Sequence, residues 1–144
     1  MALPVVVQCH GVFDVFHFGH LVHLQQARTF GDVLIVTITA DKYVFKGPNR
    51  PVFKQHQRVA MLRALAIVDD VRVIDAPGAE EAIRAVRPNV YCKGIEYKGN
   101  LKEEALVESL GGKVMYTYDL AASKIKTTKI LRHYLDAGEL TKES

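Results

Sequence analysis

The sequence predicts an α/β fold in which a parallel β-sheet is covered by helices on both faces. Short apolar runs rich in β-branched residues alternate with segments of helical periodicity along most of the chain. Glycine or proline residues separate many of these segments, as expected for loops between strands and helices. Regular alternation of this kind joins parallel strands by right-handed crossovers, which place helices on both faces of the sheet.

The first half of the chain supplies two strands and two helices. The apolar run at residues 5–9 is typical of a buried strand. A helix is expected at about 20–30, because apolar residues recur on one face and Gly31 provides a stop. The continuous β-branched run at 33–39 predicts a strand that is buried on both faces. A loop containing glycine and proline then leads to a helix at about 54–66.

The second half continues the same alternation. Three more apolar runs are expected to be strands, at residues 71–74, 90–92 and 114–117. Three helices are expected beside them, at about 79–86, 101–110 and 127–138. The first of these helices ends before Pro88, and the second is stopped by Gly111 and Gly112.

Length and composition indicate one domain over residues 1–144, with 49% hydrophobic residues to form a core. The net charge of +3 is too small to indicate nucleic-acid binding. Neither a membrane-spanning run nor a secretion signal is recognisable, so a cytoplasmic location without a membrane partner is expected. Cys9 and Cys92 end strand-like runs and are expected to be reduced core residues.

The junction between the first strand and the first helix carries the most specific motif, Gly-Val-Phe-Asp-Val-Phe-His-Phe-Gly-His at residues 11–20. A helix N-terminus attracts anions because its free N–H groups and dipole point outward. His17 and His20 on that turn are suited to phosphate oxygens, and Gly19 allows close approach to the backbone. Together they are able to stabilise charge that develops on a phosphorus centre.

A zinc site is the alternative for this histidine-rich region, which includes His10 and His23 as well. Catalytic zinc normally has three protein ligands with defined geometry. The expected strand and helix direct His10 and His23 away from the pair at 17 and 20, so no metal site and no tightly bound zinc are expected.

These residues resemble the nucleotidyltransferase superfamily marked by the His-x-Gly-His motif, in its cytidylyltransferase-like branch. That branch includes glycerol-3-phosphate cytidylyltransferases and the adenylyltransferase domain of heptose-phosphate enzymes. The resemblance extends over nearly the whole chain, at Asp41, Lys46–Pro51, Gln57–Arg58, Lys93–Tyr97 and Lys126–Ile130. It implies a Rossmann-like sheet of five parallel strands in the order 3-2-1-4-5, with ligands beyond the carboxyl ends of the central strands.

The resemblance also assigns roles around this edge. The expected catalytic residues are His17, His20 and Lys46. The expected nucleotide-binding residues are Val12, Phe13, His17, Gly19, His20, Lys93, Gly94, Glu96, Thr127 and Thr128. An ordinary helix cap is the alternative for the two threonines.

Asp14, Asp41 and Arg58 are the candidates for the acceptor side of the site. Like-charge repulsion makes Asp14 better suited to orienting the backbone than to touching phosphate, and a simple turn residue is the alternative. An arginine exposed on a helix surface is the alternative for Arg58.

The expected function is transfer of a nucleoside monophosphate from CTP or ATP to a phosphorylated sugar, polyol or related small phosphate. Mg²⁺ is expected to arrive with the nucleotide, the assembly is expected to be a homodimer, and the product would serve surface polysaccharide synthesis. A glycerol-3-phosphate cytidylyltransferase and a non-catalytic nucleotide-binding module are the alternatives. The chain departs from the glycerol-phosphate enzymes at Ala121, near which those enzymes have an arginine, and Lys124 and Lys126 are candidates to replace its charge.

Overall fold

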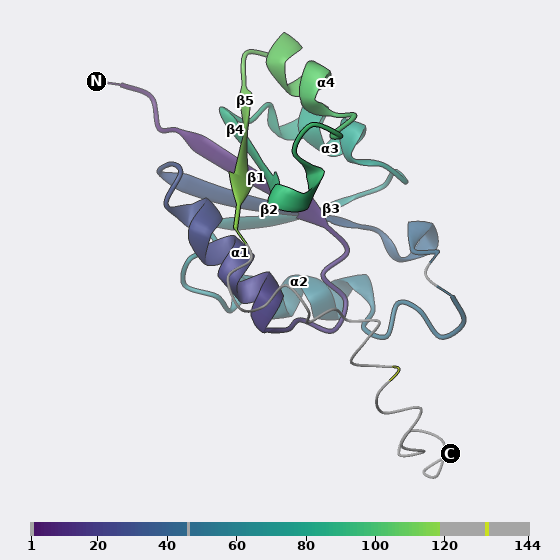
Figure 1. Cartoon of the computed structure of the whole chain (residues 1–144). Coiled ribbons are helices and arrows are strands. Elements are labelled where there is room, and N and C mark those ends of the chain that lie inside the picture. Colours follow the sequence, from purple (N-terminus) through teal and green to yellow (C-terminus); the bar gives the residue numbers. More distant parts are fainter. Residues whose placement is uncertain (1, 46, 119–131, 133–144) are drawn as a thin grey trace.

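The structure of the chain, a computed structural model, describes residues 2–45, 47–118 and 132. Its centre is a parallel sheet of five strands in the order β3-β2-β1-β4-β5, drawn in Figure 1. The strands are β1 (Val6–Gly11), β2 (Val33–Thr39), β3 (Asp70–Ile74), β4 (Val90–Gly94) and β5 (Lys113–Thr117). The predicted fold class and strand order are therefore confirmed.

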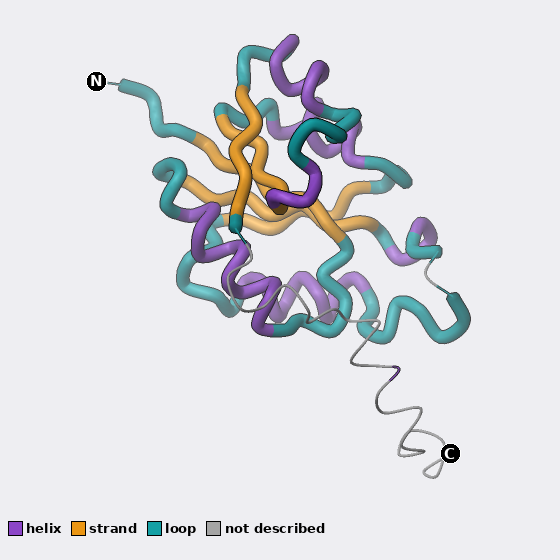
Figure 2. Tube along the Cα trace, in the orientation of Figure 1, coloured by secondary structure: helices purple, strands orange, loops and turns teal. Residues whose placement is uncertain are grey.

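Among the described residues, four helices cover the two faces of this sheet. Figure 2 shows them as purple tubes around the orange strands. They are α1 (Phe18–Arg28), α2 (Gln55–Arg63), α3 (Ala79–Val86) and α4 (Glu104–Ser109). Leu24 of α1 and Leu62 of α2 join the main core under β1 and β2. Ile83 of α3 and Val107 of α4 pack with Tyr91 on the other face. None of the helices in the described part of the chain is long and apolar enough to cross a membrane.

Some helices and strands begin or end at other residues than the sequence predicted. Strand β1 extends to Gly11, because His10 and Gly11 still pair with β2. Helix α1 begins at Phe18 because His17 caps it. The expected helix at 101–110 is shorter, since residues 102–103 form a turn before α4. The expected helix at 127–138 lies outside the described residues, apart from position 132.

The central position of β1 determines where a ligand can bind. Cys9 of β1 pairs with Val36 of β2 on one side and with Cys92 of β4 on the other. The carboxyl ends of these three parallel strands therefore meet at one edge of the sheet, and the loop before α1 begins there. Short 3₁₀ turns, η1 (Asp41–Tyr43) and η2 (Ile95–Tyr97), follow β2 and β4 at the same edge. Ligands of open α/β sheets bind at such an edge, where the strand order reverses.

Candidate functional site

The loop between β1 and α1 follows a strained path. Phe13 and Val15 have φ angles of 51° and 50°, in the left-handed region that non-glycine residues rarely adopt. For a β-branched residue such as Val15 this conformation costs on the order of 1–3 kcal/mol. Burial of the Phe13 side chain, which is 7% exposed, offsets part of that cost. Strain held in place by surrounding packing is common at functional sites.

His17 and His20 form a reciprocal cap at the start of α1. Nδ1 of His17 accepts the backbone N–H of Gly19 at 3.0 Å, and Nδ1 of His20 accepts the backbone N–H of His17 at 3.1 Å. A ring nitrogen that accepts a hydrogen bond carries no proton, so the neutral ring has its proton on Nε2. Each imidazole therefore has Nε2–H as the donor that a ligand can meet, beside the N-terminus of an 11-residue helix.

Aromatic packing holds the orientation of this pair. The two imidazole rings stack with centroids 3.8 Å apart. The rings of Phe13 and Phe16 approach His20 at centroid distances of 5.3 Å and 5.4 Å. These ring contacts hold both imidazoles in a fixed orientation at the start of α1.

Asp14 connects the strained loop to the segment before α2. Its carboxylate accepts hydrogen bonds from Arg50 Nε at 2.9 Å and from the backbone N–H groups of Val52 and Phe53 at 2.8 Å and 2.9 Å. Burial raises the pKa of Asp14, but the hydrogen bonds from Phe53, Val52 and Arg50 outweigh it and hold the pKa below its usual value. This geometry suits the backbone-orienting role weighed for Asp14, since the side chain is 3% exposed.

Arg50 lies in the segment before α2 and is bound to Asp14. Its Nε is bound to Asp14, whereas its Nη2 is buried and has no hydrogen-bond partner in the described part of the chain. A buried guanidinium N–H without an acceptor is costly. An anionic oxygen of a ligand would satisfy it.

Arg58 joins the ends of β1 and β2 from inside the protein. Its guanidinium donates to the carbonyl oxygens of Phe53, Val12 and Thr39 at 3.0 Å, 2.9 Å and 2.8 Å, and to Asp41 Oδ1 at 2.8 Å. The side chain has no exposed surface. This geometry favours a positioning role for Arg58, because its buried guanidinium is engaged by backbone carbonyl groups and by Asp41. The expected contact of Arg58 with the acceptor stays a prediction.

Asp41 lies at the start of η1, where β2 ends, with its side chain 30% exposed. Its backbone N–H donates to Gln55 Oε1 at 3.0 Å. Burial raises the pKa of Asp41, but the hydrogen bonds with Arg58 and Gln55 outweigh it and lower the pKa below its usual value. Asp41 is therefore an ionised group at the rim of the site.

The end of β4 forms the opposite side of the same edge. Lys93 Nζ lies 4.4 Å from the centre of the Tyr97 ring. A Cβ added to Gly94 would meet the carboxylate of Glu96, which is the flexible end of a side chain and can move away. Burial, and then the charge of Lys93, lower the pKa values of His10 and His23 to about 4. Lys93 thus supplies positive potential between β1 and β4.

The structure therefore gathers at one edge most of the residues expected to form the site. The shared edge holds Val12, Phe13, Asp14, His17, Gly19, His20, Asp41, Lys93, Gly94 and Glu96. Lys46, Lys124, Lys126, Thr127 and Thr128 lie outside the described residues.

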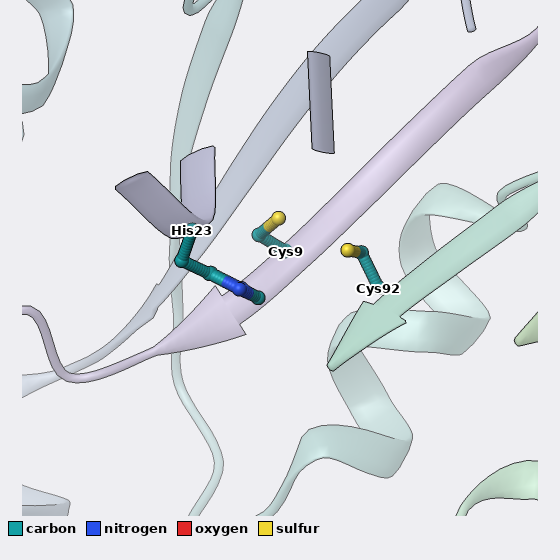
Figure 3. Close-up of side chains that lie close together, drawn as sticks. All are labelled: Cys9, His23 and Cys92. Carbon is teal, nitrogen blue, oxygen red and sulfur yellow. The ribbon is translucent and has the colours of Figure 1, made fainter. Parts of the chain in front are cut away.

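Sequence reasoning missed a cluster of three side chains beneath this edge. Cys9, His23 and Cys92, from β1, α1 and β4, lie close together (Figure 3), with one ligand atom of each within 4.8 Å of the others. The strand order 3-2-1-4-5 already makes β1 and β4 neighbours, and both cysteines end strand-like runs. The strand order together with the positions of the two cysteines could therefore have indicated that Cys9 and Cys92 lie side by side.

Comparison with known proteins identifies relatives over most of the chain. The family model described as cytidylyltransferase-like matches residues 8–133. The bifunctional protein HldE of Desulfatibacillum aliphaticivorans is 36% identical over 130 residues, which is 88% of this chain and 26% of that protein. HldE of Syntrophotalea carbinolica is 37% identical over 137 residues, 93% of this chain and 28% of that protein. The chain thus spans little more than a quarter of the length of these relatives.

Solved structures show the same fold at low sequence identity. A lipopolysaccharide core biosynthesis protein from Thermoplasma volcanium has a TM-score of 0.66 at 24% identity, covering 81% of this chain and 97% of that protein. TmcAL from Thermotoga maritima, bound with alpha-thio ATP, has a TM-score of 0.63 at 15% identity, covering 92% of this chain and 50% of that protein.

Proposed function

Because the chain belongs to the cytidylyltransferase-like family, we propose that it transfers a nucleoside monophosphate from CTP or ATP to a phosphorylated small molecule. The acceptor class is a sugar phosphate, a polyol phosphate or a related compound, and pyrophosphate is released. The HldE relatives support the sugar-phosphate class, because the sequence resembles the adenylyltransferase domain of heptose-phosphate enzymes over most of its length.

The observation that carries this proposal is the reciprocal histidine cap at the N-terminus of α1. In nucleotidyl transfer an acceptor oxygen attacks the α-phosphorus, the bond to the β-phosphate oxygen breaks, and pyrophosphate leaves. The protein's contribution is to align the two anions and to stabilise the charge that develops. The Nε2–H groups of His17 and His20, at the N-terminus of α1, are donors suited to that task.

The carboxylates of the site favour a phosphate acceptor over a hydroxyl acceptor. A hydroxyl needs a general base near its oxygen, whereas a phosphate is already ionised at neutral pH. Asp14 and Asp41 are the carboxylates next to the loop, and both are engaged by arginine and backbone donors. The buried Nη2 of Arg50 offers a complementary donor for an anionic acceptor.

Mg²⁺ belongs to the same proposal as a companion of the nucleotide. It prefers oxygen ligands in octahedral geometry. Within the described ranges the one group of three possible metal ligands contains two thiols and an imidazole, which do not fit Mg²⁺. The triphosphate itself would therefore supply most of the oxygens, and the ion would offset phosphate charge.

The decisive experiment measures pyrophosphate release from four nucleoside triphosphates, each combined with a panel of sugar and polyol phosphates. We expect CTP or ATP to react with at least one phosphorylated acceptor in the presence of Mg²⁺. His56→Ala provides a matched control for histidine loss, because His56 is exposed on α2. Nucleotide binding without pyrophosphate release for any acceptor would instead identify a nucleotide-binding module. Light scattering of the purified chain tests the expected homodimer.

A further inference from the structure

Three potential metal ligands converge between β1, β4 and α1. Cys9 and Cys92 are register partners on adjacent parallel strands, and neither has exposed surface. His23 reaches them from α1, as Figure 3 shows. One ligand atom of each residue lies within 4.8 Å of the other two. Two sulfurs bound to one tetrahedral zinc at about 2.3 Å are about 3.8 Å apart, so closing the group by roughly 1 Å would bring all three into bonding range.

The imidazole of His23 makes a hydrogen bond through one ring nitrogen, as metal-binding histidines usually do. Its Nδ1 lies 2.6 Å from Oγ1 of Thr117, which is buried at the end of β5. A hydrogen bond from Nδ1–H to an oxygen fixes the tautomer and the ring orientation, and it leaves the Nε2 lone pair for a metal. With Nδ1 as the donor in this contact, the ring would be held with Nε2 as its ligand atom.

We propose that Cys9, His23 and Cys92 bind one thiophilic metal ion, for which Zn²⁺ is the fitting example. Thiolate and imidazole ligands select zinc over the hard cation Mg²⁺. Two thiolates and one Zn²⁺ make a neutral unit, so the metal would not place a net charge in the core. Three protein ligands leave a fourth position for water or another small ligand.

Proton release accompanies this binding. The hydrogen bond with Cys92 and burial raise the pKa of the Cys9 thiol. Zn²⁺ would replace two thiol protons, which pass to solvent, while His23 is already neutral. Lys93 and Glu96 are the charged groups whose fields reach His23, and their opposite charges act in opposite directions.

Because of the position of this cluster, a bound metal ion would affect how α1 is held against the sheet. His23 lies three residues after His20 on α1, while the cysteines belong to the two strands that flank the candidate site. A bound ion would therefore tie the histidine-bearing helix to β1 and β4. This proposal differs from the expectation, drawn from the sequence, that the protein contains no tightly bound zinc and that both cysteines are reduced core residues.

The test uses the full chain, purified with a reductant and stripped of metal by a chelator. Co²⁺ is titrated first, because cobalt thiolate sites show charge-transfer absorption, and Zn²⁺ is then added in competition, with Mg²⁺ as the hard-cation control. We expect one Co²⁺ per chain with this absorption, displacement by Zn²⁺, no displacement by Mg²⁺ and a higher Tm with Zn²⁺. Absence of the charge-transfer absorption in the wild-type chain would overturn the proposal.

Variants assign the ligands. Cys92→Ser and His23→Gln should each weaken Zn²⁺ binding by at least about tenfold, while His56→Ala should bind as the wild type does. The chain has two cysteines, so undiminished binding by the Cys9→Ser/Cys92→Ser double variant would also overturn the proposal. If these variants do not fold, X-ray absorption of the zinc-loaded wild type decides, because sulfur neighbours support the site and purely nitrogen and oxygen neighbours refute it. None of these readouts requires a nucleotide, so the result is independent of the proposed transfer activity.

Discussion

His17 and His20 stack at 3.8 Å and close the first turn of α1 together, because each Nδ1 accepts a backbone N–H of that turn. Capping and ligand binding thus use different nitrogens of the same rings. A substitution that preserves the cap can therefore separate the chemical role of these residues from their structural role.

His20→Gln should lower kcat by roughly 10²–10³-fold, the usual loss when one donor to transition-state charge is removed. A glutamine at the third helical position can still accept the N-cap N–H, so Tm should change little. His20→Ala should show the same loss of kcat together with a lower Tm, because the cap is also lost. Pyrophosphate release and thermal melting measure the two effects, with His56→Ala as the control. A folded His20→Gln protein with wild-type kcat would exclude the pair from catalysis.

Asp14→Ala should destabilise the protein by roughly 3–5 kcal/mol, because it leaves Arg50 as an unpaired buried charge. It also removes the acceptor for the backbone N–H groups of Val52 and Phe53. Urea unfolding measures the change. Glu81→Gln breaks the exposed ion pair with Arg84 and should leave the free energy of unfolding nearly unchanged. Equal stability of the two variants would contradict the structural role given to Asp14.

Acid should remove stability that Asp41 contributes. The pKa of Asp41 in the folded protein is below the ordinary value of 3.8, so the folded state prefers the ionised form. Its contribution is complete above the unfolded pKa and is lost as pH falls through the lowered folded pKa. Urea unfolding from about pH 6 to about pH 2.5 should therefore show a smaller decline for Asp41→Asn than for the wild type. Identical slopes would mean that the pairing with Arg58 does not stabilise the ionised form.

A phosphorylated acceptor should be obligatory. The test compares one sugar with and without its phosphate, and we expect kcat/KM to be lower for the free sugar by at least about 100-fold, the loss of one strong charge-assisted contact. Equal kcat/KM values would point to transfer onto a hydroxyl.

Arg50→Lys should raise KM for the phosphorylated acceptor by about tenfold, because lysine keeps the charge but loses the guanidinium fork that includes the buried Nη2. Arg84→Lys, which changes an exposed arginine on α3, provides the control. An unchanged KM in Arg50→Lys would remove Arg50 from acceptor binding.

The strands and the main motif were readable from sequence because their signals are local. The β-branched run at 33–39 gives β2 with the same ends in the structure. The strand-to-helix junction with His17 and His20 was likewise placed correctly, although α1 starts two residues earlier than expected. The parallel sheet follows from alternation alone, whereas its order was implied by the family resemblance and is confirmed by the pairing.

Tertiary structure alone decided which polar residues face inward. An exposed helix arginine was the alternative for Arg58, yet the side chain is fully buried. It bonds the carbonyl group of nearby Phe53 and those of the more distant Val12 and Thr39. Asp14 and Arg50 are 36 positions apart and meet because the loops after β1 and β2 end at the same sheet edge. Cys9, His23 and Cys92 converge for the same reason. Periodicity reports burial along one segment, whereas a cluster drawn from three segments exists only after the strands have paired and the helix has packed.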